Sequence, residues 1–246
     1  MNEARALRAI LFDKDGTLLD YEKTWGAINR AAATLAGAGD DALAARLLEL
    51  GGVDPVSGRT RADSLLAAGN TREIARAWAD AGSPLDVESL TRQLDELFTQ
   101  SAAHAVPVTD LAALFGRLTA RGLVLGIASS DSEAAIRVTL RTFGLSAHVR
   151  TVIGYDSGFG SKPGPGMVLA FAASTGLSPA EIAVVGDNRH DLEMARAAGA
   201  GWKIGVLTGT GSRETLAPLA DLCLSSISEM EDALSMSLGP PAGSAD

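Results

Sequence analysis

Hydrophobic and polar residues follow two different patterns along this chain, and the change falls near Pro107. An apolar run at residues 9–12 stops at Asp13-Lys14-Asp15-Gly16-Thr17, which predicts a buried strand followed by a tight polar turn. From about residue 21 to residue 104 the apolar positions recur at helical spacing and no strand is evident. In this stretch the pattern predicts helices at 24–38, 41–50, 72–81 (with Thr71 as its N-cap) and 86–100.

After Pro107, short apolar runs alternate with helical segments. We expect strands at 123–128, 151–153, 182–185, 202–206 and 221–224, and helices at 110–121, 133–143, 166–175, 192–198 and 227–234. Nearly continuous apolar strands between helices are typical of a parallel sheet covered on both faces. The pattern therefore predicts an α/β fold, a Rossmann-like three-layer core. We assign residues 1–20 and 105–236 to the core, 21–104 to an inserted all-helical domain and 237–246 to a frayed tail.

Composition narrows the classes of protein that fit. The 246 residues are 46% apolar and only 4% aromatic, which excludes wholesale disorder and predicts a core of Ala, Leu, Val and Ile. One cysteine, Cys223, and three histidines do not favour a disulfide or a zinc cage. Neither a membrane span nor a signal-like segment is evident, so we expect a soluble cytoplasmic protein. The net charge of −9 disfavours nucleic-acid partners but leaves a small phosphorylated substrate open.

Chemically active side chains follow several of the predicted strands. Ligands of open parallel sheets bind beyond the carboxyl ends of the strands. The residues expected there are Asp13 and Asp15, Ser129 and Ser130, Lys162, and Asp187 with Asp191. Four acids, two hydroxyls and an ammonium group are therefore expected to converge on one edge of the sheet.

Such a set of groups fits phosphoryl transfer. Asp13 and Asp15 lie two positions apart in an extended segment, so their side chains are expected to point the same way. One carboxylate can attack phosphorus to give an aspartyl-phosphate, and the other can exchange protons with the leaving oxygen and with water. Because close acids repel each other, a hard cation such as Mg²⁺ is expected among them, with Asp187 completing its ligands.

The phosphate itself needs donors and space. Lys162 is expected to neutralise phosphate oxygens and to shield the attacking carboxylate. The hydroxyl of Ser129 and nearby backbone N–H groups are expected to hold the remaining oxygens, and Gly16 permits close approach of the backbone.

Four motifs resemble those of haloacid-dehalogenase-superfamily hydrolases: FDKDGTLLD (12–20), IASSD (127–131), SKPGP (161–165) and VGDNRHDLEMARAAG (185–199). The resemblance implies that Asp13 is the nucleophile and Asp15 the acid and base. It also implies that Mg²⁺ is held by the Asp13 side chain, the Asp15 carbonyl and Asp187, with Asp191 next to it. The helical insert then corresponds to the mobile C1-type cap of the phosphoglycolate phosphatase-like branch, which the segment GVLTGTGSRETL (205–216) also resembles.

Simpler interpretations compete at several positions. Ser129 could simply be the N-cap of the helix at 133–143, although Ser130, Asp131 or Ser132 could cap it equally well. Asp191 could simply be an acid in the first turn of its own helix. We expect His190 to be a solvated loop residue and Lys14 to point away from the site without a role.

The helical insert also offers candidates. Arg59 and Arg61 could bind a carboxylate of the substrate or could be solvated arginines. Tyr21, Lys23 and Trp25 follow the catalytic turn and could line the entrance, although Trp25 fits the core of the first helix equally well.

The sequence thus predicts a Mg²⁺-dependent phosphomonoesterase that acts on a small phosphorylated metabolite, for which 2-phosphoglycolate is one candidate. One alternative is a β-phosphoglucomutase-like phosphosugar mutase, although such relatives often carry Val at the position of Thr17. A catalytically silent partner-binding protein is an alternative from another class. We expect neither nucleic-acid nor membrane partners, and a monomer and a homodimer both stay open.

Overall fold

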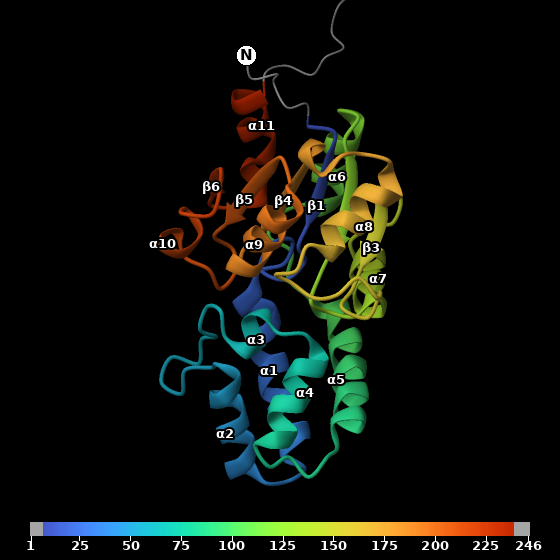
Figure 1. The fold of residues 1–246 in the computed structure, drawn as a ribbon. Coiled ribbons are helices and arrows are strands. Elements are labelled where there is room, and N and C mark those ends of the chain that lie inside the picture. The colour runs from blue at the N-terminus through green and yellow to red at the C-terminus, as the bar shows by residue number, and fades with distance from the viewer. Residues whose placement is uncertain (1–6, 239–246) are drawn as a thin grey trace, which may run out of the picture.

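The computed structural model describes residues 7–238, which form an α/β part and a helical part below it in Figure 1. The described residues form one six-stranded parallel sheet in the order β3-β2-β1-β4-β5-β6. Its strands are β1 (Ala9–Phe12), β2 (Val124–Ala128), β3 (Val149–Ile153), β4 (Ile182–Gly186), β5 (Trp202–Val206) and β6 (Leu222–Leu224). The α/β fold class is therefore confirmed.

Strand β1 lies at the centre of the sheet, and its neighbours determine which loops meet. Phe12 pairs with Ile127 of β2 on one side and with Val185 of β4 on the other. The chain therefore leaves these three strands at nearly the same level of one sheet edge. This register brings together the segments after Phe12, after β2 and after β4, which contain most of the predicted site residues.

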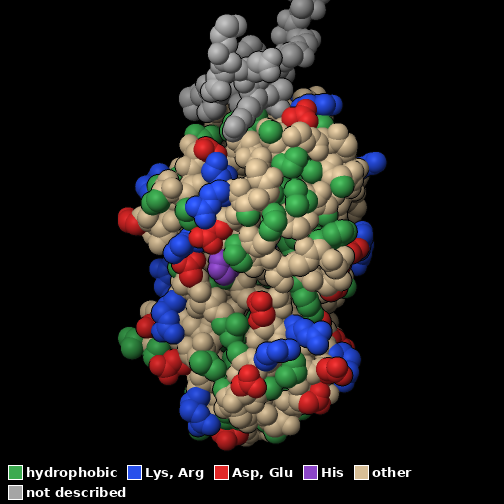
Figure 2. Space-filling model, viewed as in Figure 1, with side chains coloured by type: hydrophobic (Ala, Val, Ile, Leu, Met, Phe, Trp, Pro, Cys, Tyr) green, Lys and Arg blue, Asp and Glu red, His purple; other side chains and the backbone are tan. Residues whose placement is uncertain are grey.

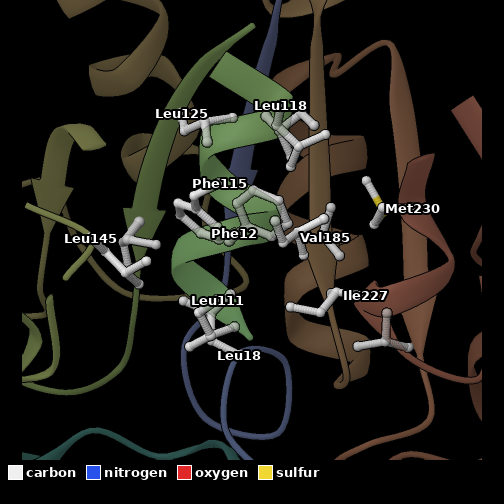
Figure 3. Packing of buried hydrophobic residues seen from close by; sticks show 14 of the residues in the cluster. Phe12, Leu18, Leu111, Phe115, Leu118, Leu125, Leu145, Val185, Ile227 and Met230 are labelled. Carbon is white, nitrogen blue, oxygen red and sulfur yellow. The ribbon is translucent and has the colours of Figure 1, made fainter. Parts of the chain in front are cut away.

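Helices cover both faces of the sheet, as expected for apolar parallel strands. Alternate residues of β1 point to opposite faces, so Phe12 joins one hydrophobic cluster and Leu11 joins another. In the first cluster the ring of Phe12 stacks on Phe115 with centroids 5.1 Å apart (Figure 3). The helices of this part are α6 (Leu111–Ala120), α7 (Glu133–Thr142), α8 (Gly166–Thr175), α9 (Arg189–Ala198), α10 (Arg213–Leu216) and α11 (Met230–Leu238).

The five helices between β1 and α6 pack around a hydrophobic cluster of their own, which includes Trp25, Trp78 and Phe98. They are α1 (Tyr21–Gly37), α2 (Asp41–Gly51), α3 (Leu65–Ala68), α4 (Thr71–Asp80) and α5 (Val87–Ser101). The domain division at residues 20 and 105 stays a prediction, and we call residues 21–104 the cap from here on.

Several predicted helix boundaries were wrong by a few residues, for reasons that the caps explain. Asn70, not Thr71, is the N-cap of α4, since its side chain and that of Glu73 form a capping box. In the same way Asn188 starts α9 at Arg189, three residues before the predicted start. Helix α11 extends to Leu238, two residues into the predicted tail, and residues 239–246 lie outside the described part.

Two surface properties bear on partners. No helix within residues 7–238 is long and apolar enough to cross a bilayer. On the face shown in Figure 2, acidic and basic side chains are interspersed, and the described residues show no large continuous basic patch there. This mixed surface gives no electrostatic footprint for a nucleic acid on that face.

Candidate active site

A cavity lies between the carboxyl edge of the sheet and the cap. Most of the site residues predicted from the sequence line it: Asp13, Asp15, Ser129, Ser130, Lys162, Asp187 and Asp191. They come from the ends of β1, β2 and β4, from the loop before α8 and from the first turn of α9. The sheet register therefore assembles residues that are up to 178 positions apart, since the set runs from Asp13 to Asp191.

Three buried carboxylates form the centre of the site. Asp13, Asp187 and Asp191 each offer an oxygen within 4.8 Å of the others. The ammonium group of Lys162 lies between two of them, 2.5 Å from Oδ1 of Asp13 and 2.7 Å from Oδ1 of Asp191. Burial is the main cause that raises the pKa of Asp13 to about 7, and the neighbouring acids add to it while Lys162 opposes it. Burial, followed by Asp13 and Asp191, also raises the pKa of Asp187.

This cluster fits a divalent cation. With three carboxylates ionised and one ammonium group present, the cluster lacks positive charge. Carboxylate oxygens are the ligands that hard cations such as Mg²⁺ take in proteins. A bound divalent ion would supply the missing charge and favour the ionised form of all three acids.

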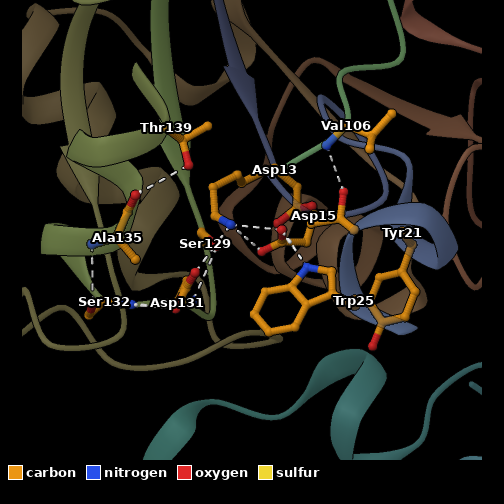
Figure 4. A network of polar contacts seen from close by, with 12 residues as sticks. Asp13, Asp15, Tyr21, Trp25, Val106, Ser129, Asp131, Ser132, Ala135 and Thr139 are labelled. Carbon is orange, nitrogen blue, oxygen red and sulfur yellow. Dashed lines mark hydrogen bonds and ion pairs between the residues drawn. The ribbon is translucent and has the colours of Figure 1, made fainter. Parts of the chain in front are cut away.

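Asp15 lies beside this cluster and is held by two donors. Its Oδ1 accepts hydrogen bonds from Nζ of Lys14 and Nε1 of Trp25, each 2.7 Å away (Figure 4). Trp25 thus serves both as cap core and as a partner of the site, two interpretations that the sequence treated as alternatives.

The expectation that Lys14 points away from the site was wrong. Its side chain is buried and also lies 3.1 Å from Oδ2 of Asp131, so it bridges two acids that line the cavity. The chain does not continue as an extended strand here: it turns, with the N–H groups of Leu18 and Leu19 bonded to the carbonyl of Lys14. The simple alternation of side chains therefore fails after Asp13.

Gly16 makes room for Asp187. Its φ is +81°, and a Cβ atom there would lie 2.5 Å from the Asp187 carboxylate. The loop after β5 completes this packing, because Thr208 Oγ1 donates to the Gly16 carbonyl and Thr210 N donates to Asp187 Oδ2. Sequence reasoning missed Thr208 and Thr210, whose only signal was the resemblance of segment 205–216.

The serines after β2 divide their roles. Ser132 is the N-cap of α7, so Ser129 is free of that task. The Ser129 hydroxyl is buried at the cavity and accepts a hydrogen bond from the N–H of Asp131. Ser130 donates to the carbonyl of Ala68 in the cap, 3.2 Å away.

Asp191 takes part both in the start of its helix and in the acid cluster. Its Oδ2 accepts from the N–H of Asn188 and so helps to start α9, while Oδ1 binds Lys162. His190, which we expected to be solvated in a loop, lies in the first turn of α9 and lines the cavity. Its Nδ1 is buried without a partner among the described residues, so the expectation was wrong.

The structure does not bring Arg59 and Arg61 to the cavity. Arg59 is exposed and lies 3.8 Å from Glu22, and Arg61 donates to the carbonyl of Glu49. Asp54 folds this loop back on itself by accepting from Val56 and Ser57, so the arginines stay at the cap surface. Lys23 is likewise exposed and paired with Asp20.

Known proteins resemble this chain in sequence. A family model described as haloacid dehalogenase-like hydrolase matches residues 7–199. Phosphoglycolate phosphatases of Escherichia coli (strain K12) and Shigella boydii are each 30% identical over 220 residues, which covers 81% of this chain and 81% of each relative.

Solved structures show the same fold. CbbY from Rhodobacter sphaeroides, in complex with phosphate, has a TM-score of 0.70 at 22% identity and covers 95% of this chain and 100% of its own. A predicted phosphoglycolate phosphatase from Haemophilus somnus has a TM-score of 0.69 at 18% identity, covering 92% and 97%. Together with the motif residues assembled at the sheet edge, the family match shows that this chain belongs to the haloacid dehalogenase-like hydrolases.

Proposed function

We propose that this protein is a Mg²⁺-dependent phosphomonoesterase that hydrolyses a small phosphorylated metabolite through an aspartyl-phosphate. The observation that supports it most is the placement of Lys162 between Asp13 and Asp191, in a buried cluster that includes Asp187 and lies beside Asp15. This arrangement combines a nucleophile, an acid and base, and positive charge for the phosphate.

Asp13 is the nucleophile of this mechanism. Lys162 holds its Oδ1, so Oδ2 is the oxygen that attacks phosphorus while the bond from phosphorus to the alcohol oxygen breaks. Lys162 and the Ser129 hydroxyl bind oxygens of the transferring phosphoryl group, which lowers the energy of its transition state.

Asp15 is the general acid and base of this mechanism. It gives a proton to the departing alcohol oxygen and then accepts one from the water that attacks the aspartyl-phosphate. That attack releases phosphate and restores the Asp13 carboxylate. Lys14 and Trp25 fix the direction of the Asp15 carboxyl throughout.

The Asp13 side chain, the Asp15 carbonyl and Asp187 would hold Mg²⁺, with Asp191 close by. When bound, the ion supplies positive charge that offsets the acids and the phosphate. Gly16 and the Thr210 N–H keep the Asp187 carboxylate in position for this task.

The test is a screen of phosphomonoesters that includes p-nitrophenyl phosphate, 2-phosphoglycolate and sugar phosphates. The relatives named phosphoglycolate phosphatases make 2-phosphoglycolate an obvious member of the panel. We expect release of free phosphate with Mg²⁺ and none with EDTA, restored by excess Mg²⁺. A mutase would instead return isomerised sugar phosphate. A protein that neither binds Mg²⁺ nor hydrolyses any phosphate would favour a silent partner-binding protein.

A further inference from the structure

The wall of the cavity that faces the acids comes from the cap and is mostly apolar. Tyr21 and Trp25 of α1, Phe98 of α5 and the aliphatic Leu66 and Ile74 contribute to it. The rings of Trp25 and Phe98 meet edge to face with centroids 5.0 Å apart, so they form a rigid surface. A surface of this kind suits the carbon face of a ligand.

Positive charge is scarce around the same cavity. Among the described residues that line it, Lys162 is the one Lys or Arg, and it is already bound to Asp13 and Asp191. Five carboxyl groups line the cavity: Asp13, Asp15, Asp131, Asp187 and Asp191. Asn188 and His190 also line the cavity, but a second anionic group on the substrate would find no second Lys or Arg there and would lie among five acids.

One buried polar group of the cap has an open hydrogen-bond position. Asn29 is 1% exposed and lines the cavity, and its Oδ1 has no partner among the described residues. Its Nδ2 lies 3.5 Å from Thr60 Oγ1. The side chains of Asn29 and Thr60 also lower the pKa of Tyr21, which burial raises overall.

The contacts of Tyr21 indicate which way the side-chain amide of Asn29 is oriented. The hydroxyl of Tyr21 donates to the Leu66 carbonyl at 2.7 Å, and Figure 4 shows it directed toward the cap helix below it. The Tyr21 oxygen can therefore still accept a hydrogen bond. This acceptor suits the NH₂ group of Asn29 and leaves Oδ1 of Asn29 for a ligand. Asn29 follows Trp25 by four residues, about 6 Å along α1, so it lies farther from Asp15 than the Trp25 ring does.

We propose that the alcohol part of the substrate is uncharged, lies with its carbon face on Trp25 and Phe98, and carries a hydroxyl that donates to Asn29 Oδ1. This inference rests on the proposed phosphatase activity and narrows its substrate class. A hydroxyl fits because it can donate to a lone acceptor, whereas a carboxylate only accepts. Neutral diol, polyol or sugar phosphates meet this description, and phosphorylated carboxylic acids do not.

The experiment compares three series of straight-chain phosphates from two to five carbons, with hydroxyl, carboxylate or methyl at the far end. The two-carbon members include 2-hydroxyethyl phosphate and 2-phosphoglycolate. At the best length we expect kcat/KM for the hydroxyl compound to exceed that of the carboxylate by at least about tenfold. A carboxylate compound as good as its hydroxyl partner would overturn the inference while the phosphatase activity stands. Hydrolysis of none of the compounds, nor of p-nitrophenyl phosphate, would overturn the proposed function itself.

Variants of Asn29 test the contact directly. Asn29→Leu should remove the preference for the hydroxyl over the methyl compound, and Asn29→Asp should keep it because a carboxylate also accepts. Arg30→Ala, at the exposed next position of α1, is the matched control and should behave like the parent protein. Circular dichroism checks folding; if Asn29→Leu does not fold, Asn29→Ser, which retains an acceptor but shortens its reach, should weaken the preference. An unchanged preference in a folded Asn29→Leu protein would contradict the contact.

Discussion

Two buried lysines define the site at the scale of single residues. Lys162 joins Asp13 to Asp191, and Lys14 joins Asp15 to Asp131. Each ammonium group therefore balances two acids, of which Asp13, Asp131 and Asp191 are buried and Asp15 is partly buried. Removing one partner of such a buried set leaves uncompensated charge, which is far more costly than losing an exposed ion pair.

Replacing Lys14 by methionine tests its positioning role. Without Lys14, Asp15 loses one of its two donors, and we expect kcat to fall by about 10- to 100-fold, as for other misplaced catalytic groups. We also expect the free energy of unfolding, measured with urea, to fall by about 3–5 kcal/mol. Lys23→Met is the matched control, because Lys23 is exposed and should change neither quantity appreciably. A Lys14→Met protein with the kcat and pH–rate profile of the parent protein would show that Lys14 does not position Asp15.

Gly16→Ala tests the packing of Asp187. The new methyl group would collide with the Asp187 carboxylate, so we expect the Kd for Mg²⁺ to rise by about 10- to 100-fold, measured by calorimetric titration. Gly39→Ala separates collision from backbone strain, because Gly39 has a φ of +96° and nothing within 4 Å of a new Cβ. Equal effects of the two substitutions on the Kd would show that Gly16 does not act through Asp187.

Sequence motifs were sufficient to bring Asp13, Asp15, Lys162 and Asp187 to attention, because strand ends converge in a parallel sheet. Lys14 and Trp25 were not recognised as partners of Asp15. Their roles depend on a turn and on cap packing, which alternation of side chains does not describe.

At the scale of elements, the segment after β2 contains two serines with different tasks, one at the start of a helix and one at the cavity. Ser132 caps α7 by accepting from the N–H of Ala135, so Ser129 can face the cavity. The sequence left both serines as candidates for the cap, since each precedes the helix by a few residues.

Alanine substitutions separate these two serines. Ser132→Ala should lower the free energy of unfolding by about 1 kcal/mol, the usual value for a lost N-cap. Ser129→Ala should instead lower kcat/KM by about tenfold, because it removes a donor to the phosphoryl group. Urea unfolding and steady-state kinetics on both variants provide the measurements. The assignment is wrong if Ser129→Ala destabilises and Ser132→Ala does not.

The sequence predicted the main helices and strands and the starts of α2, α7 and α8, but it misplaced the starts of α1, α4 and α9. Side-chain caps from Asp20, Asn70 and Asn188 determine where α1, α4 and α9 begin, and several candidates stood near each start. The four-residue helices α3 and α10 were missed because so short a segment has no detectable periodicity.

At the scale of the whole molecule, polar contacts join the cap to the core around the cavity. Tyr155 donates to Asp95 at 2.7 Å, and Asn70 donates to Ser161 at 3.2 Å beside Lys162. These contacts keep the cap over the acids and so maintain their burial. Helical spacing predicted the helices that make this cover, but contacts between residues as far apart as Asn70 and Ser161 leave no mark in a local pattern.

The burial of the acids predicts how pH acts on the metal-free protein. Asp13 has a pKa of about 7 and Asp131 one of about 6, both above their usual value, because burial disfavours their charged forms. Between roughly pH 4 and pH 7 the folded state thus binds more protons than the unfolded state, and stability falls as pH rises. The opposite slope without metal would contradict these pKa shifts.

Mg²⁺ should offset this loss, because it binds the deprotonated acids. Thermal denaturation at pH 5, 6, 7 and 8, with Mg²⁺ or EDTA, should show a rise in Tm on adding Mg²⁺ that grows with pH. A shift independent of pH would place the ion elsewhere than at Asp13 and Asp187.

The proposed function depends most directly on covalent phosphorylation of Asp13. The protein is mixed with excess p-nitrophenyl phosphate and Mg²⁺, quenched with acid within milliseconds, digested and analysed by mass spectrometry. Asp15→Asn should increase the trapped fraction, because it slows hydrolysis of the intermediate while p-nitrophenolate leaves without a proton. We predict one phosphoryl group on Asp13, and neither adduct nor turnover in Asp13→Asn. Turnover retained by Asp13→Asn, or an adduct on another residue, would contradict the mechanism.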